Sequence, residues 1–113
     1  MAVQRVVLQI GMGTDIRGSD CTKAAVRAVR DALWHNSINI AAALGQPLDA
    51  MQVAITVGVP RPDEVDHQQV LAVLPYGRGT LDVVRGGLEI INDAGTDATL
   101  IANAAVVVRL DLA

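Results

Sequence analysis

Apolar runs alternate with polar turn segments along the 113 residues, and this pattern predicts four strands and two helices. Residues 3–10 are rich in β-branched side chains and predict a largely buried strand that ends at the glycines following it. An amphipathic helix is expected next, capped by Ser19 or Asp20 and ending at a C-cap at Gly45. Polar residues at 35–39 interrupt its apolar stripe, so a kink or a break is expected there.

The middle of the chain predicts one strand and one short helix. Residues 51–59 alternate well enough to form the second strand. Asp66 and Gln69 have the spacing of a capping box, which favours a short helix over the apolar residues that follow, stopped by Pro75.

The last two apolar runs, residues 80–91 and 99–112, predict strands that pair as a hairpin. Gly86 and Gly87 predict a β-bulge or a close approach of another backbone. The order β-α-β-α-β-β predicts one α+β domain over residues 1–113, a two-layer sandwich whose helices cover one face of a mixed sheet. Its first crossover should be parallel and right-handed if the two strands are neighbours. The other face stays exposed unless another subunit covers it.

Composition favours an oligomer. Hydrophobic residues make up 51% of the chain, and Trp34 and Tyr76 are its only aromatic residues. So apolar a small chain is expected to hide part of its surface in a homo-oligomer. The net charge of −3 and the few aromatic residues argue against nucleic acid or an anionic membrane as partner. With Cys21 as its single cysteine and no evident signal peptide or membrane span, the chain is expected in the cytoplasm.

Residues 11–18, Gly-Met-Gly-Thr-Asp-Ile-Arg-Gly, lie between a strand and a helix, where phosphate-binding loops occur. The dinucleotide-binding pattern fails because its third glycine is Ile16, and the P-loop pattern fails because residues 19–20 are Ser-Asp. Two interpretations remain open. The segment is either a tight turn closed by the side chain of Asp15, or a ligand-binding loop that presents Asp15 and Arg17.

The predicted first helix carries Lys23, Arg27, Arg30 and Trp34 at steps of four, three and four residues, which places them on one stripe. Such a stripe is suited to carboxylates or phosphates. The alternative is a solvated face on which Asp31 pairs with Arg27, and the lone indole of Trp34 favours an interface.

Two further segments carry chemically useful side chains. A histidine, an amide and a hydroxyl follow one another at His35, Asn36 and Ser37, and a loop combines the phenol of Tyr76 with the guanidinium of Arg78. Two histidines and one cysteine do not form a metal-binding signature, so neither a metal nor another cofactor is expected.

The stretches GMGTDIRGSDCTKAAVRAVRDALWHNSI, VAITVGVP, PYGRGTLDVVRGG and IANAAVVV together resemble a small family of conserved hypothetical proteins found in bacteria and plants. That family is marked by an N-terminal Gly-x-Gly-x-Asp-x-His-Gly motif, which Gly11, Gly13, Asp15 and Gly18 match. Arg17 occupies the position of the motif's histidine, which puts in doubt any proton transfer by that histidine. The family has no assigned activity, so the resemblance points to the site and not to a reaction.

These observations predict a homo-oligomer that binds a small polar, anionic or cyclic amide metabolite between subunits, either as a binding protein or as a cofactor-independent acid–base enzyme (hydrolase, lyase or isomerase). In this hypothesis the arginines and Lys23 hold the ligand while Asp15 or His35 moves a proton. A non-catalytic accessory subunit or ligand sensor is the alternative. A third hypothesis is a Ser19–Lys23 nucleophile pair, which competes with helix capping by Ser19. The predicted catalytic residues are Asp15, His35 and Lys23, and the predicted ligand-binding residues are Gly11, Gly13, Arg17, Gly18, Asn36, Ser37, Tyr76 and Arg78.

Overall fold

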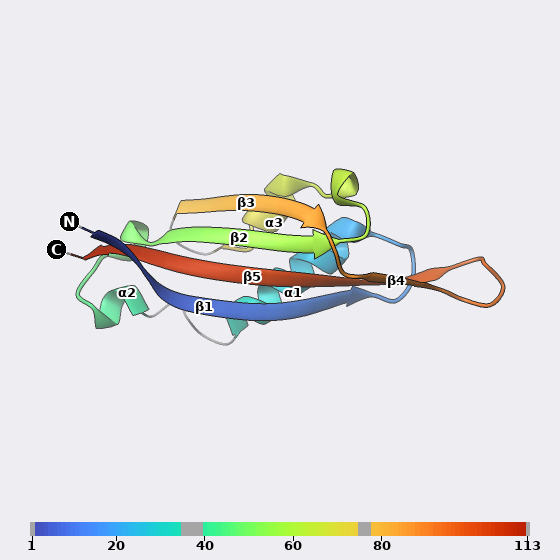
Figure 1. The fold of residues 1–113 in the computed structure, drawn as a ribbon, viewed down its shortest axis with the longest axis horizontal. Coiled ribbons are helices and arrows are strands. Elements are labelled where there is room, and N and C mark those ends of the chain that lie inside the picture. Colours follow the sequence, from blue (N-terminus) through green and yellow to red (C-terminus); the bar gives the residue numbers. More distant parts are fainter. Residues whose placement is uncertain (1, 35–39, 75–77, 113) are drawn as a thin grey trace.

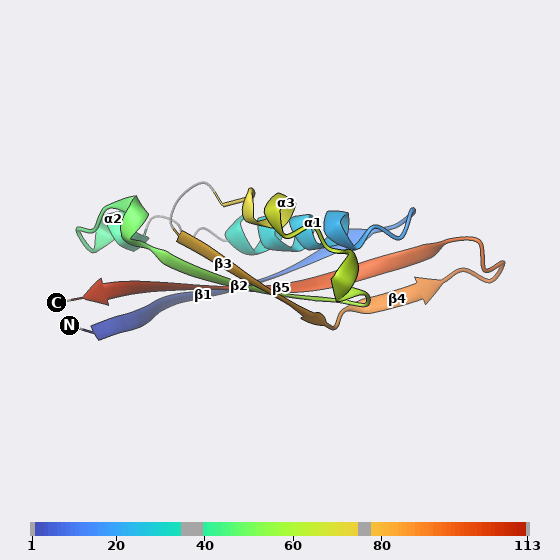
Figure 2. The ribbon, with the colours of Figure 1, turned by 90° about the horizontal axis from the view of Figure 1, so that it is seen from above.

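Helices pack on one face of a long, twisted five-stranded sheet in the computed structural model, which describes residues 2–34, 40–74 and 78–112 (Figures 1 and 2). The α+β class and the mixed sheet with helices on one side are therefore confirmed. The elements are β1 (Ala2–Asp15), α1 (Cys21–Trp34), α2 (Ile40–Ala43), β2 (Gln52–Val59), α3 (His67–Leu71), β3 (Arg78–Arg85), β4 (Leu88–Ile91) and β5 (Ala98–Leu112), with single 3-10 turns at Leu48–Ala50 and Pro62–Glu64.

The strands lie in the order β1-β5-β2-β3, and β4 pairs with β5 separately, over Ala98 to Ile101. β5 is antiparallel to both β1 and β2, so β1 and β2 run parallel to each other with β5 between them. The first crossover thus joins parallel strands that are not neighbours. Buried valine, isoleucine and leucine side chains of β2 and β5 face the helices and form the core together with the buried residues of α1.

The prediction that residues 80–91 pair with residues 99–112 as a hairpin is right only for residues 88–91. β3 pairs in parallel with β2, and only β4 forms an antiparallel pair with β5. The chain crosses the end of β2 between these strands, and a Cβ atom on Gly87 would lie 1.9 Å from the carbonyl oxygen of Ile101. Close backbone approach, one of the two roles expected of Gly86 and Gly87, is therefore the observed one.

The prediction that the first strand stops at Gly11 is wrong, because β1 continues to Asp15 and pairs with β5 along this whole stretch. A Cβ atom on Gly11 would lie 2.3 Å from the backbone nitrogen of Ala32. On Gly13 it would lie 2.3 Å from the carbonyl oxygen of Ala24. These glycines let the backbone of α1 rest directly on the sheet, and the buried alanines of α1 complete this contact.

The helix boundaries follow local signals. Asp66 caps α3 by accepting hydrogen bonds from the backbone nitrogens of Gln68 and Gln69, and the side-chain amide of Gln69 donates back to the Asp66 carboxylate. The capping prediction is thus confirmed. Gly45 follows α2 with φ of +72°, as a C-cap glycine should. The expected interruption at residues 35–39 lies outside the described residues.

Candidate functional site

The turn between β1 and α1 is organised by the carboxylate of Asp15, whose residue is only 4% exposed. Its Oδ2 accepts a hydrogen bond of 2.9 Å from the backbone nitrogen of Asp20. Asp20 in turn caps α1, because its Oδ1 accepts a hydrogen bond of 3.0 Å from the backbone nitrogen of Lys23. Gly18 adopts φ of +90°, which favours glycine. Asp15 therefore holds the turn and sets the start of the helix.

An open cleft of about 580 Å³ lies beside this turn, and we name it the basic cleft. The predicted site residues Asp15, Arg17 and Lys23 line it together, and Arg27 joins them. Its complete lining is Thr14, Asp15, Ile16, Arg17, Lys23 and Arg27. Three cations and one carboxylate give the basic cleft a net positive charge in a chain whose net charge is −3.

Arg27 and Asp31 do not form the ion pair expected of them on a solvated helix face. Arg27 donates a hydrogen bond of 2.6 Å to the carbonyl oxygen of Thr14, and Asp31 accepts one of 2.9 Å from the backbone nitrogen of Met12. Arg27 Nη1 also lies 3.8 Å from Asp15 Oδ1. The side chains of α1 thus satisfy polar groups along the outer edge of β1, because β1 is the edge strand of the sheet.

A second cluster, which the sequence analysis did not single out, ties the far side of the turn to the sheet. Arg61 donates to the carbonyl oxygen of Ser19 at 3.1 Å, to Glu64 Oε2 at 2.9 Å and to the carboxylate of Glu89. Glu89 and then Glu64 raise the pKa of Arg61 above its usual range. Ser19 has φ of 53° and lies outside α1, and Asp20 rather than Ser19 caps the helix. The sequence could not reveal this contact, because 42 positions separate Ser19 from Arg61 and local spacing relates only nearby residues.

Cys21 begins α1 and is buried beneath this cluster. Burial raises the pKa of its thiol, and the nearby Arg61 only partly offsets this effect. The thiolate is the reactive form, so we expect folded protein at pH 8 to resist alkylation by iodoacetamide while protein unfolded in urea reacts completely. Intact mass spectrometry measures this difference. Rapid alkylation of the folded protein would contradict the buried position.

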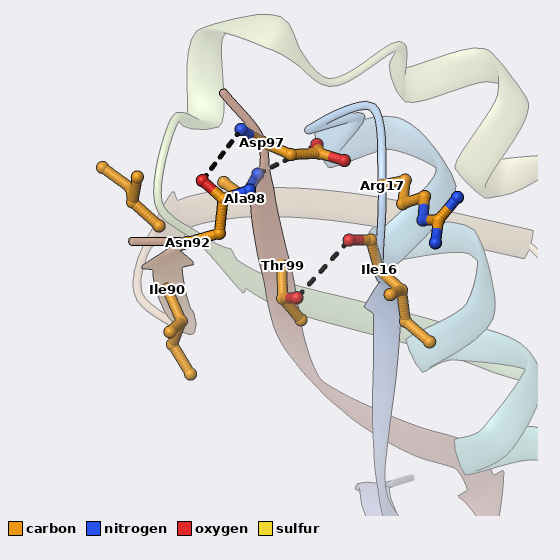
Figure 3. A pocket seen from close by; sticks show the side chains of 8 residues that line it. Ile16, Arg17, Ile90, Asn92, Asp97, Ala98 and Thr99 are labelled. Atoms are coloured by element: carbon orange, nitrogen blue, oxygen red, sulfur yellow. Dashed lines mark hydrogen bonds between the residues drawn. The ribbon is translucent and has the colours of Figure 1, made fainter. Parts of the chain in front are cut away.

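A smaller cleft of about 340 Å³ opens between the turn and the β4–β5 hairpin (Figure 3). Arg17 and Ile16 border it on one side and Ile90, Asn92 and Asp97 on the other. The hydroxyl of Thr99 donates to the carbonyl oxygen of Ile16 at 3.4 Å, which holds the two segments together. Arg17 thus borders both this cleft and the basic cleft.

The structure does not bring Arg78 to the basic cleft. Arg78 begins β3 and lines a cleft of about 360 Å³ on the sheet with Gln52, Thr80 and Arg109. Arg78 pairs with Gln52 of β2, which pairs with Arg109 of β5, whereas Asp15 pairs with Leu100 of β5. Nine positions of β5 separate Arg109 from Leu100, so the two sites lie about 30 Å apart along the sheet. The predicted residues His35, Asn36, Ser37 and Tyr76 lie outside the described residues. Gly11 and Gly13 lie under α1 rather than in a ligand-binding loop.

A family model for a conserved hypothetical protein, Lin0512_fam, matches residues 5–108 of the chain. The chain belongs to the Lin0512 family. A similar solved structure is described as an FtsZ-like protein of unknown function from Nostoc punctiforme. It shares 38% sequence identity and a TM-score of 0.87, over 99% of each chain. Among curated proteins, none matches.

The residues that carry the family resemblance have distinct tasks in this member of the Lin0512 family. Gly11 and Gly13 make room for α1, Asp15 closes the turn, and Gly18 supplies its positive φ. Arg17 differs from these four because its side chain is exposed at the rim of two clefts. Four of these positions therefore shape the turn and its packing under α1, whereas Arg17 contributes an exposed cation.

The described residues hold no helix that is both long and apolar enough to cross a membrane. Within the same residues, no three histidine, cysteine, aspartate or glutamate side chains gather in a way that could hold a metal ion.

Proposed function

We propose that this protein binds a small metabolite through an oxyanion, a carboxylate or a phosphate, in the basic cleft. The observation that carries the proposal is the gathering of Arg17, Lys23 and Arg27 around one cleft in an otherwise acidic chain. Lys23 is the only lysine of the chain. Guanidinium groups recognise planar carboxylate and tetrahedral phosphate oxygens by paired hydrogen bonds, and an ammonium group adds a compact charge.

The side chains rather than the helix terminus must supply the binding. The backbone nitrogen of Lys23 already donates a hydrogen bond to the carboxylate of Asp20. This negative charge at the first turn of α1 would repel an anion that approached the free backbone nitrogens there. Arg17 and Lys23 approach the cleft from opposite ends of the turn, and both are exposed. Arg27 donates one hydrogen bond to the carbonyl oxygen of Thr14, and its guanidinium adds a third positive charge to the lining of the cleft.

Asp15 supports binding and not the proton transfer that the sequence suggested as an alternative. Its carboxylate is buried, bonded to the Asp20 backbone nitrogen and close to Arg27. A carboxylate used in this way holds the turn and positions Arg27. The geometry therefore favours a binding protein over an acid–base enzyme at this cleft.

Isothermal titration calorimetry with inorganic phosphate and with malonate tests the proposal. We expect both to bind, and we expect Arg17→Ala and Lys23→Ala each to weaken binding about tenfold, because each removes one charge-assisted interaction worth about 1.5 kcal/mol. Arg30→Ala is the matched control, since Arg30 is an exposed cation of α1 outside the cleft. Absence of binding for both probes, or an equal loss in Arg30→Ala, would count against the basic cleft.

A further inference from the structure

The described helices lie on one face of the sheet and leave the opposite face uncovered (Figure 2). Side chains that point away from the helices include Ile10 at 66% exposure and Leu88 at 60%. Register pairs join them through β5 into one surface, because Ile10 pairs with Ala105 and Leu88 pairs with Ile101. We name this surface the open face; its large apolar members are Leu8, Ile10, Met12, Ile101, Leu88 and Ile90.

The amount of exposed surface matches one side of a stable interface. The chain measures 58 × 22 × 18 Å and exposes 6622 Å². A compact monomer of its mass exposes about 5900 Å². The excess of about 700 Å² is close to the roughly 800 Å² that each partner hides in an interface of standard size. Contiguous apolar surface of this kind marks an interaction site in soluble proteins.

Charge is distributed unevenly along the open face. Arg5, Arg109 and Arg78 lie in one row across β1, β5 and β3, with Gln52 of β2 between the last two. Like charges on paired strands repel each other, so this row of arginines favours an acidic partner. Asp111 lies two residues from Arg109, but among the described residues no acidic side chain forms a salt bridge with these arginines. Asp82 of β3 lies farther along the sheet, in the register row of Ile10, and the opposite end carries Asp93 in the turn between β4 and β5.

The open face thus has its large apolar side chains on β1, β4 and β5, three arginines in one row at one end and Asp93 at the other end. A surface with this arrangement complements itself after a twofold rotation. We propose that the open face binds a second copy of this chain, sheet against sheet. The arginine row of each copy then lies over the β4–β5 turn of the other, and the apolar residues of both form the centre. This inference goes beyond the oxyanion site and does not depend on it.

The mass of the full chain in solution tests the inference. Sedimentation equilibrium between about 1 and 100 μM, the range of ordinary stable dimers, should give twice 11.8 kDa for the wild type. Ile10→Asp should reduce the mass to that of one chain, while Leu44→Asp should leave the dimer intact, because Leu44 is an apolar side chain, 44% exposed, that lies after α2 and away from the open face. Met12→Lys, at a side chain already 55% exposed, repeats the test if Ile10→Asp fails to fold.

Charge reversal tests the orientation of the two copies. Arg109→Glu should raise the dissociation constant of the dimer at least tenfold, and adding Asp93→Lys should recover most of this loss. A wild-type monomer over the whole concentration range would overturn the inference, as would a dimer that Ile10→Asp and Met12→Lys leave unchanged. A complex with a different protein in place of the dimer would also overturn it.

Discussion

Gly13→Ala is expected to prevent folding or to lower the midpoint of thermal unfolding by about 10 °C or more. The added Cβ atom would lie 2.3 Å from both the carbonyl oxygen of Ala24 and the backbone nitrogen of Ala28. Backbone atoms cannot rotate away as the end of a side chain can, so α1 would have to move off the sheet. Overpacking of this kind costs about 3 kcal/mol or more, which corresponds to a shift of that size. Circular dichroism during a thermal scan measures it.

Gly95→Asn is the matched control for Gly13→Ala. Gly95 adopts φ of +70°, a conformation typical of glycine, but nothing lies within 4 Å of its would-be Cβ atom. Asparagine tolerates this backbone conformation better than other side chains, so the loss should stay below about 1 kcal/mol. Equal midpoints for Gly13→Ala and the wild type would show that α1 does not rest on the backbone of β1.

Asp15→Ala should reduce the free energy of unfolding by about 2 kcal/mol, because it leaves the backbone nitrogen of Asp20 without its charged partner. The same change should weaken phosphate binding, since the turn that presents Arg17 loses the bond between Asp15 and the backbone nitrogen of Asp20 and loosens. Urea unfolding and calorimetry measure the two effects separately. Asp15→Asn keeps a side-chain oxygen for Asp20 and should lose less stability than Asp15→Ala.

The control for Asp15→Ala is Asp63→Ala, which removes an exposed carboxylate from the 3-10 turn Pro62–Glu64. It should change neither stability nor phosphate binding measurably. If Asp15→Ala unfolds like the wild type, Asp15 does not organise the turn. If it unfolds earlier yet binds phosphate normally, the turn does not present the cationic side chains.

Elements that depend on neighbouring residues were predictable from the sequence. The cap at Asp66, the start of α1 and the C-cap glycine at position 45 rest on contacts within four residues or on one backbone angle. The apolar stripe of α1 and the runs of β2 and β5 likewise report which face is buried. These signals were enough to place the α+β class and the helical layer.

Long-range pairing was not predictable by the same means. Whether Gly11 and Gly13 end a strand or lie inside one depends on what approaches them, and helix residues 11 to 21 positions later fill that space. Residues 78–85 pair in parallel with β2 instead of continuing into the hairpin, because Gly86 and Gly87 let the chain cross over Gly58. Neither the packing of α1 on these glycines nor the parallel pairing of β3 with β2 can be recognised from the spacing of nearby residues.

The candidate site divides in the same way. Asp15, Arg17 and Lys23 lie within nine positions of one another, and their proximity followed from the strand–turn–helix prediction. Arg78 belongs to a different cleft because β3 begins at the far end of the sheet, which only the strand order reveals. The sequence leaves two interpretations of Arg27, a place on a cationic stripe or an ion pair with Asp31. Its bond to the carbonyl oxygen of Thr14 is not among them, because a contact with the edge of β1 is not visible in the sequence.

The binding of an oxyanion at the basic cleft is tested most directly by an NMR titration of isotope-labelled protein with inorganic phosphate. Backbone amide shifts should move within residues 14–27 and saturate together, while the amides of Arg78, Thr80 and Arg109 stay in place. Shifts concentrated at those three residues would move the anion site to the sheet cleft, and an unchanged spectrum at tens of millimolar phosphate would contradict oxyanion binding altogether.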